Sequence, residues 1–159
     1  MEAYGAVDEA NSAIGAARLY TTANPVLDPI LDRAQNDLFD LGADLATPAR
    51  EEKLSYQPLR IQASQVERLE AEIDALNEKL APLTSFVLPG GSPAAAHLHL
   101  ARAIMRRAER DIVRLAESEN VSSEAVKFAN RLSDLLFVAA RAANDEGKSD
   151  IMWKPGANR

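Results

Sequence analysis

Arginine side chains concentrate in one stretch of the sequence, FVLPGGSPAAAHLHLARAIMRRAER, residues 86–110. The arginines are Arg102, Arg106, Arg107 and Arg110. Guanidinium groups bind phosphate and carboxylate oxygens through paired hydrogen bonds. A Gly-Gly turn precedes the predicted helix, and a helix N-terminus offers free backbone N–H groups to an anion. The whole chain has a formal net charge of -6, so this local positive charge indicates a binding site for phosphate or carboxylate.

A helical wheel for residues 93–118 separates an apolar arc from a polar one. The apolar arc, which we expect to face the core, contains Leu100, Ala101, Ile104, Met105, Ala108, Ile112 and Leu115. The polar arc contains His99, Arg102, Arg106, Glu109 and Arg110. The alternative interpretation is a solvated face with intrahelical ion pairs. Because arginine outnumbers acid here, we expect an anion from another helix, another subunit or a ligand to lie against it.

A second polar stripe lies on the predicted helix from Ser123 to about Asn144. The stripe contains Asn130, Asp134, Phe137 and Arg141, with Lys127 beside it. A solvated face is again the alternative. Within so apolar a helix, however, the stripe suits the wall of a partly buried site, where Asn130 and Asp134 would meet arginine or a ligand.

The first predicted helix, Glu2 to Leu19, carries Asp8, Ser12 and Gly15 on one face, with Gly5 nearby. Glycine within a helix costs about 0.5–1 kcal/mol relative to alanine and is tolerated where another backbone or a ligand comes close. Ordinary helix packing is the alternative explanation. The Asp8 carboxylate could otherwise neutralise an arginine of residues 93–118.

Periodicity, prolines and capping residues predict an all-α chain of one domain, residues 1–159. The five expected helices cover about 2–19, 25–46, 62–80, 93–118 and 123–144. Ser92 is the expected cap of the fourth helix, with Pro93 at its first position, and Ser122 or Ser123 caps the fifth. Residues 47–61 form a polar connection and residues 145–159 a polar tail. Period-two runs typical of strands are missing.

Several classes of protein and site are excluded by composition and spacing. The chain has no cysteine and no apolar run near 18 residues, which excludes thiolate chemistry and a membrane span. The acidic balance argues against nucleic-acid binding, and without a signal peptide a cytoplasmic location is expected. His97 and His99 point in different directions on a helix, so they are no chelate pair. No Glu-x-x-His, phosphate-binding loop or Gly-x-Ser-x-Gly motif occurs.

Four segments resemble, in order, the motifs of the PduO-type ATP:cob(I)alamin adenosyltransferases. They are EAYGAVDEANSAIG, QNDLFDLGADLAT, FVLPGGSPAAAHLHLARAIMRRAER and NRLSDLLFVAARAAN. The resemblance implies a five-helix bundle, ferritin-like in general appearance, that assembles as a homotrimer with an active site at each subunit interface. It also implies transfer of the 5′-deoxyadenosyl group of ATP to the cobalt of Co(I) cobalamin, with Mg²⁺ required and triphosphate released.

The resemblance also assigns roles to single residues. It places Arg102 and Arg106 at the ATP site as catalytic residues, with Arg106 on the polyphosphate. Glu109 would organise the nucleotide and is the candidate Mg²⁺ ligand, and Asn130 would bind nucleotide. Phe86 would be a catalytic residue that covers the lower face of the corrin ring and keeps its benzimidazole off the cobalt.

Further implications concern assembly and partners. Asp8 matches the acid that pairs with Arg102 across the subunit interface. Asp134 and Phe137 are the remaining candidates for corrinoid binding. Expected partners are a reductase that supplies the electron for Co(I) and an adenosylcobalamin-dependent mutase that receives the product.

One departure from the family pattern lies at the N-terminus. Family members carry a glycine- and threonine-rich segment, of the type Thr-Gly-Asp-x-Gly-x-Thr, upstream of EAYG, where it wraps the triphosphate. Here Met1 directly precedes Glu2. The departure predicts weaker ATP binding and turnover, with fold and corrinoid binding less affected. It leaves two alternatives to an enzyme: a non-catalytic corrinoid-binding or delivery protein, and a structural bundle whose arginines serve trimer contacts.

Overall fold

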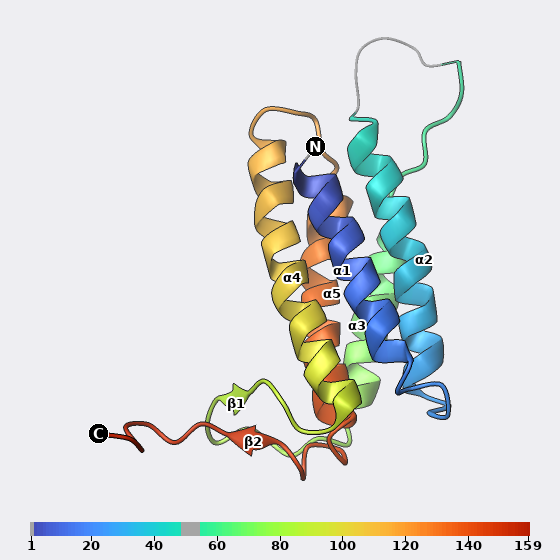
Figure 1. Cartoon of the computed structure of the whole chain (residues 1–159). Coiled ribbons are helices and arrows are strands. Elements are labelled where there is room, and N and C mark those ends of the chain that lie inside the picture. The colour runs from blue at the N-terminus through green and yellow to red at the C-terminus, as the bar shows by residue number, and fades with distance from the viewer. Residues whose placement is uncertain (1, 49–54) are drawn as a thin grey trace.

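Five helices lie side by side in the computed structural model, which describes residues 2–48 and 55–159 (Figure 1). They are α1 (Glu2–Arg18), α2 (Leu27–Ala46), α3 (Ala63–Asn77), α4 (Pro93–Ala116) and α5 (Ser123–Ala142). Helix α4 packs between α1 and α5, while α5 also contacts α3 and α2. The predicted all-α, five-helix architecture is confirmed. No helix within the described ranges is long and apolar enough to cross a membrane.

Small residues let the helices approach one another closely. Alanines are fully buried on α1, α4 and α5, as at Ala10, Ala101 and Ala139, and Phe128 is the largest of the fully buried side chains. Short side chains at helix contacts shorten the distance between the helix axes. Burial of many small apolar groups stabilises the bundle with few aromatic residues, as the 5% aromatic content requires.

Two neighbouring residues on α4 differ in exposure from what the helical wheel predicted. Leu100, which the wheel placed in the core, is 56% exposed, whereas His99, which it placed on the polar face, is 3% exposed. The reason is that α4 packs against α1 and α5 at once, so its buried arc is wider toward α5 than hydrophobicity indicates. His99 lies in that part of the arc, against the ring of Phe137.

Helices α4 and α5 both begin after a capping serine, as predicted. The Ser92 hydroxyl accepts a hydrogen bond from the Ala95 N–H at 3.1 Å, and Pro93 occupies the first turn of α4. Of the two candidates for α5, Ser122 is the cap, and it accepts from the Ala125 N–H at 3.1 Å. The caps satisfy backbone donors that would otherwise lack partners, so both helix starts are well defined.

The prediction of no strands and a polar tail was wrong at one place. Strand β1 (Val87–Leu88) pairs antiparallel with β2 (Ile151–Met152), next to the end of the bundle where α4 begins (Figure 1). Strands of two residues leave no alternating pattern in a sequence, which is why periodicity missed them. The pairing joins the C-terminal segment to the loop that carries Phe86.

A buried polar network fixes this loop and tail to the end of α5. Arg141 pairs with Asp150 at 2.7 Å, the two side chains being 8% and 2% exposed, and also donates to a backbone carbonyl of the loop. The Asn144 amide donates to the Gly90 carbonyl at 3.1 Å and accepts from the Ser92 N–H at 2.8 Å. A Cβ on Gly91, whose φ is 100°, would lie 2.2 Å from the Asn144 side chain, so the turn requires glycine.

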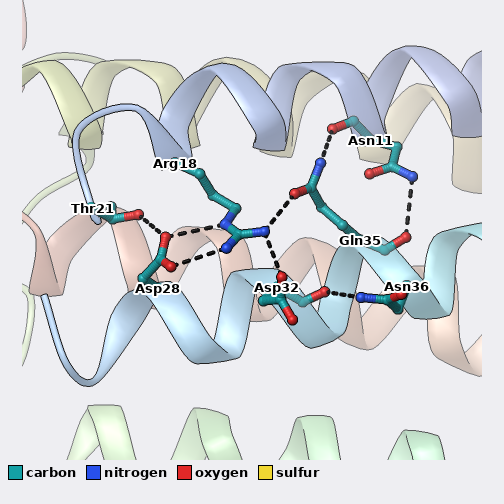
Figure 2. Close-up of polar contacts among 7 residues, drawn as sticks. All are labelled: Asn11, Arg18, Thr21, Asp28, Asp32, Gln35 and Asn36. Atoms are coloured by element: carbon teal, nitrogen blue, oxygen red, sulfur yellow. Dashed lines mark hydrogen bonds and ion pairs between the residues drawn. The ribbon is translucent and has the colours of Figure 1, made fainter. Parts of the chain in front are cut away.

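A second polar network sets the register of α1 against α2 (Figure 2). Arg18 donates two hydrogen bonds to the Asp28 carboxylate, at 3.0 and 3.1 Å, and others to Asp32 and Gln35. The Gln35 side chain donates to the Asn11 carbonyl, and the Asn11 side chain donates to the Gln35 carbonyl, both at 3.1 Å. The hydrogen bonds from Arg18 hold the pKa of Asp28 below its ordinary value.

We predict that Asp28→Asn lowers the free energy of unfolding by about 1–3 kcal/mol at neutral pH, because it removes charge-assisted hydrogen bonds. A carboxylate with a lowered pKa stabilises the fold above its unfolded-state pKa of 3.8, and this contribution is lost as the pH falls through the folded-state value. The difference between wild type and variant should therefore shrink below about pH 4 in urea titrations. Asp32→Asn, at an exposed carboxylate, is the control and should cost less than about 1 kcal/mol. A pH-independent difference for Asp28→Asn would contradict the assignment.

Candidate functional site

A cavity of about 590 Å³ lies between α4, α5 and the loop before α4. Its lining residues are Leu83, Ser85, Phe86, Val87, Pro89, His99, Arg102, Arg106, Ser133, Asp134 and Phe137. The structure thus brings together five of the side chains predicted for the site, from three separate segments. They are Phe86, Arg102, Arg106, Asp134 and Phe137.

Helical periodicity explains how α4 supplies its share of the site. His99, Arg102, Arg106 and Glu109 follow one another at intervals of three, four and three residues, so they share one stripe. Three of the four line the cavity. Helix α5 supplies the opposite stripe, which reaches from Asn130 to Phe137.

One end of the groove between these stripes is polar and charged. The Asn130 amide donates to one oxygen of Glu109 at 2.7 Å, and the other oxygen lies 3.4 Å from the Arg106 guanidinium. Glu109 is therefore held by both helices. Arg106 has a side chain that is 49% exposed, and its only ion pair within the described part of the chain is this long contact. Most of its hydrogen-bonding capacity is thus available to an anion.

The other end of the groove is aromatic. The Arg102 guanidinium carbon lies 5.4 Å from the centre of the Phe137 ring, within the range of a cation–π interaction. His99 approaches the same ring edge-on, with ring centres 6.2 Å apart. Phe86 lies on the rim, 76% exposed, with its ring centre 5.8 Å from that of Trp153. This end offers flat apolar surfaces to a ligand, beside a single positive charge.

Asp134 meets an arginine, as expected, but from its own helix. Arg131 donates to the Asp134 carboxylate at 2.7 Å and also pairs with Glu70 of α3 at 3.3 Å. Arg141, which the wheel placed on the same stripe as Asp134, is instead part of the buried pair with Asp150. The stripe therefore lines the cavity at Asp134 and Phe137, and at its end Arg141 anchors the C-terminal segment.

Asp8 lies exposed on α1 and makes no ion pair within residues 2–48 and 55–159. The ion pairs that join α1 to α4 within one chain are Glu9 with Arg107 and, at 3.9 Å, Glu2 with Arg114. Arg102 also lacks an acidic partner among the described residues. The predicted pairing of Asp8 with Arg102 of another subunit is untested by a single chain and stays a prediction.

A metal site made of protein ligands alone is not found in the described ranges, where no three His, Asp or Glu side chains gather around one point. Mg²⁺ does not need such a site, because it commonly binds one or two carboxylates together with substrate phosphates. Glu109 is the carboxylate that fits this requirement, although Asn130 and Arg106 already contact its two oxygens.

Among the cavity residues that the sequence analysis did not assign to the site, His99 is the one whose side chain titrates near neutral pH. Burial lowers its pKa, and the nearby positive charge of Arg102 lowers it further, so the imidazole is neutral near pH 7. Its position three residues before Arg102 was the available signal, since that spacing places both on one stripe.

The family model described as cobalamin adenosyltransferase matches residues 1–143. The chain belongs to the cobalamin adenosyltransferase family. It is 49% identical over 159 residues to the corrinoid adenosyltransferase of Mycobacterium tuberculosis, covering 99% of this chain and 81% of that protein. It is 39% identical over 163 residues to the corrinoid adenosyltransferase of Bacillus subtilis, again covering 99% and 81%.

Solved structures of this family share the fold of the chain. One is an alanine-for-phenylalanine variant of the PduO-type ATP:corrinoid adenosyltransferase from Lactobacillus reuteri, complexed with cobalamin and ATP. It has a TM-score of 0.84 and 40% identity, over 96% of this chain and 84% of that one. A lysine-for-arginine variant complexed with ATP has a TM-score of 0.82 and 39% identity, over 96% and 86%. The predicted adenosyltransferase family and helical fold are confirmed.

We predict that Asp150→Asn in this adenosyltransferase releases the loop that carries Phe86. The change leaves the buried Arg141 charge without its partner, which costs about 3–5 kcal/mol unless the segment opens. Amide hydrogen exchange should therefore speed up at Trp153, whose N–H donates to the Phe86 carbonyl at 2.8 Å, more than in the helices.

The matched control is Lys148→Ala, which removes an exposed 3.9 Å pair with Asp145 in the same segment. It should leave exchange at Trp153 unchanged. If the Trp153 amide exchanged at the same rate in Asp150→Asn as in wild type, the buried pair would not anchor the loop.

Proposed function

We propose that the groove between α4 and α5 holds both substrates, ATP at its polar end and the corrinoid at its aromatic end. The protein is a corrinoid adenosyltransferase by family, so the reaction is ATP-dependent adenosylation of a corrinoid. The observation that carries the proposal is the order of side chains along one groove. Asn130, Glu109 and Arg106 lie at one end, and Phe137 and Phe86 lie at the other.

Arg106, at the polar end, and Arg102, one turn along α4 toward the aromatic end, would both contact the polyphosphate. When C5′ of ATP is attacked, the bond to the triphosphate oxygen breaks and the oxygen keeps the electron pair. Guanidinium groups placed beforehand stabilise that developing charge. Asn130 would bind the nucleotide, and Glu109 would contribute one oxygen to Mg²⁺, which the phosphates would mainly hold.

At the aromatic end, Phe86 would cover the lower face of the corrin ring and exclude water and the benzimidazole from cobalt. Removing an axial ligand makes reduction to Co(I) easier, and the electron would come from a separate reductase. The Co(I) lone pair then forms the Co–C bond as the C5′–O bond breaks. Phe137 and Asp134 would form the wall that holds the corrinoid, and the bundle would align cobalt with C5′.

The same proposal covers assembly and cellular context. A homotrimer would place Asp8 of one subunit beside Arg102 of its neighbour and cover the open side of the groove. The product would pass to an adenosylcobalamin-dependent mutase in the cytoplasm. These statements, and the requirement for Mg²⁺, stay predictions.

The single tryptophan of the chain supplies a direct binding test. Trp153 contacts Phe86 at the cavity rim, so a bound corrinoid should quench tryptophan fluorescence by energy transfer. With reduced cobalamin and MgATP, the visible spectrum should change to that of a Co–C bond. Quenching without the spectral change would indicate a binding or delivery protein. The absence of both quenching and the spectral change would refute the proposed function.

We predict that Arg106→Ala lowers turnover about 100-fold, because a contact to the departing triphosphate is lost. The free energy of unfolding should change by less than about 0.5 kcal/mol, since the Arg106 side chain is half exposed and does not pack in the hydrophobic core. Arg106→Lys should recover little activity, because one ammonium group cannot reproduce a bidentate contact.

Arg107→Ala is the matched control for this prediction. It removes an exposed arginine from the neighbouring position, where the side chain pairs with Glu9 on the side of α1. Its turnover should stay within about twofold of wild type. Equal activities for the two alanine variants would show that the arginine row is a solvated face.

We also predict that Asp8→Ala weakens trimer formation, because the change leaves Arg102 of the neighbouring subunit without its acidic partner at a buried interface, at a cost of about 3–5 kcal/mol. Sedimentation velocity over a dilution series should show dissociation at higher protein concentration than for wild type. Glu9→Ala, one position along the same helix, is the control. Identical sedimentation and activity for Asp8→Ala and wild type would exclude the pairing.

A further inference from the structure

One buried nitrogen in the cavity lacks a hydrogen-bond partner. Nε2 of His99 is shielded from solvent, and no donor or acceptor among the described residues reaches it. Two other buried polar atoms share this state, Oδ1 of Asn11 and Nε of Arg68, but neither residue lines the cavity. A buried imidazole nitrogen without a partner destabilises a protein unless a ligand satisfies it. Because Nε2 has almost no accessible surface while other atoms of His99 line the cavity, a ligand group would reach Nε2 only as the imidazole ring turns toward the cavity.

The surroundings of His99 restrict the chemistry of that group. Arg102 and Asp150 are the charged residues that act on the imidazole, the first lowering and the second raising its pKa, and burial has the largest effect. The ring stays neutral, so Nε2 either donates or accepts a single hydrogen bond, depending on the tautomer. A neutral imidazole gives a phosphate no charge stabilisation, and Arg102 repels a cationic ligand. A neutral amide, which has both a donor and an acceptor, fits either tautomer.

His99 also lies at the aromatic end of the groove, one turn from Arg102 and two turns from Arg106 on the same stripe. A corrin ring carries acetamide and propionamide groups around its rim. These neutral primary amides are the groups of a corrinoid that project beyond its flat face. A ring seated against Phe137 would bring its rim, rather than its centre, toward α4.

We propose that Nε2 of His99 forms a hydrogen bond with one primary amide on the rim of the corrin ring, which makes His99 a residue that determines corrinoid specificity. This inference rests on the proposed function, which places the corrinoid at the aromatic end. It differs from a packing role, in which His99 would act only by supporting Phe137 and thereby Arg102. A packing role predicts that loss of His99 weakens ATP use as well, because Arg102 would move.

The test compares His99→Leu, which removes the hydrogen bond, with His99→Gln, which keeps a donor and an acceptor. The probes are cobalamin and cobalamin derivatives in which a single rim amide has been hydrolysed to a carboxylate. Binding is read from quenching of Trp153 fluorescence, and the KM for ATP is measured in parallel. His97→Leu is the matched control. It replaces the other histidine of α4, whose Nδ1 lies 2.7 Å from the Pro93 carbonyl and whose ring faces Tyr20.

We expect wild type to bind one of the hydrolysed derivatives about tenfold more weakly than cobalamin, as loss of one hydrogen bond implies. His99→Leu should bind cobalamin about tenfold more weakly and lose that discrimination, with the KM for ATP unchanged. His99→Gln should retain most of both properties, and His97→Leu should behave as wild type.

Three results would overturn the inference while leaving the proposed function intact. They are wild-type binding with equal affinity for all derivatives, unchanged discrimination in His99→Leu, and a parallel rise in the KM for ATP. The last would assign His99 a packing role. If wild type gave no quenching with cobalamin itself, the proposed function would fail instead. Circular dichroism of each variant verifies folding, and the comparison of derivatives on wild type decides the amide contact even if His99→Leu does not fold.

Discussion

The buried ion pair of Arg141 with Asp150 is the interaction on which the site depends. Removing either partner of a buried pair leaves an uncompensated charge, so this pair fixes the C-terminal segment at the end of α5, next to the two-residue strands. Asn144, beside the pair, fixes the Gly-Gly turn and the start of α4. Helix α4 and the loop carrying Phe86 therefore share one anchor, and the arginine stripe and the aromatic rim keep a fixed relation to each other.

That anchor bears on how, in the proposed function, a bundle of small residues would hold a large flat substrate next to a charged one. The helices pack closely through alanine, so their interior leaves little room for a ligand. The cavity lies instead outside the core, where the loop before α4 stands over the stripes of α4 and α5. Stability then comes from the buried faces of the helices, whereas chemistry comes from side chains that are half exposed.

The sequence predicted the helices well because their signals are local. Ser92, Pro93 and the period of apolar residues each act within a few positions, and those elements are confirmed. The prediction for the C-terminal tail was wrong because Ile151 pairs with Leu88 through backbone atoms. These residues are 63 positions apart, so no local sequence pattern indicates their contact. The burial of His99 was missed for a related reason, although its place on the stripe of Arg102 and Arg106 was correct. The neighbour that buries it, Phe137, belongs to another helix, and its burial depends on packing rather than on its own polarity.

The arginine stripe remains positive in a chain of net charge -6 because the buried and half-buried acids of α2 are paired with other arginines. Asp28 and Asp32 bind Arg18, Asp37 binds Arg68, and Asp44 binds Arg60, all on the side of α2. Exposed charges act over about 8 Å at physiological ionic strength, so these distant pairs barely affect the cavity. There Arg102 faces an aromatic ring and Arg106 a single long contact with Glu109. The local arrangement of acids, and not their total number, therefore leaves the positive charge of this groove largely uncompensated.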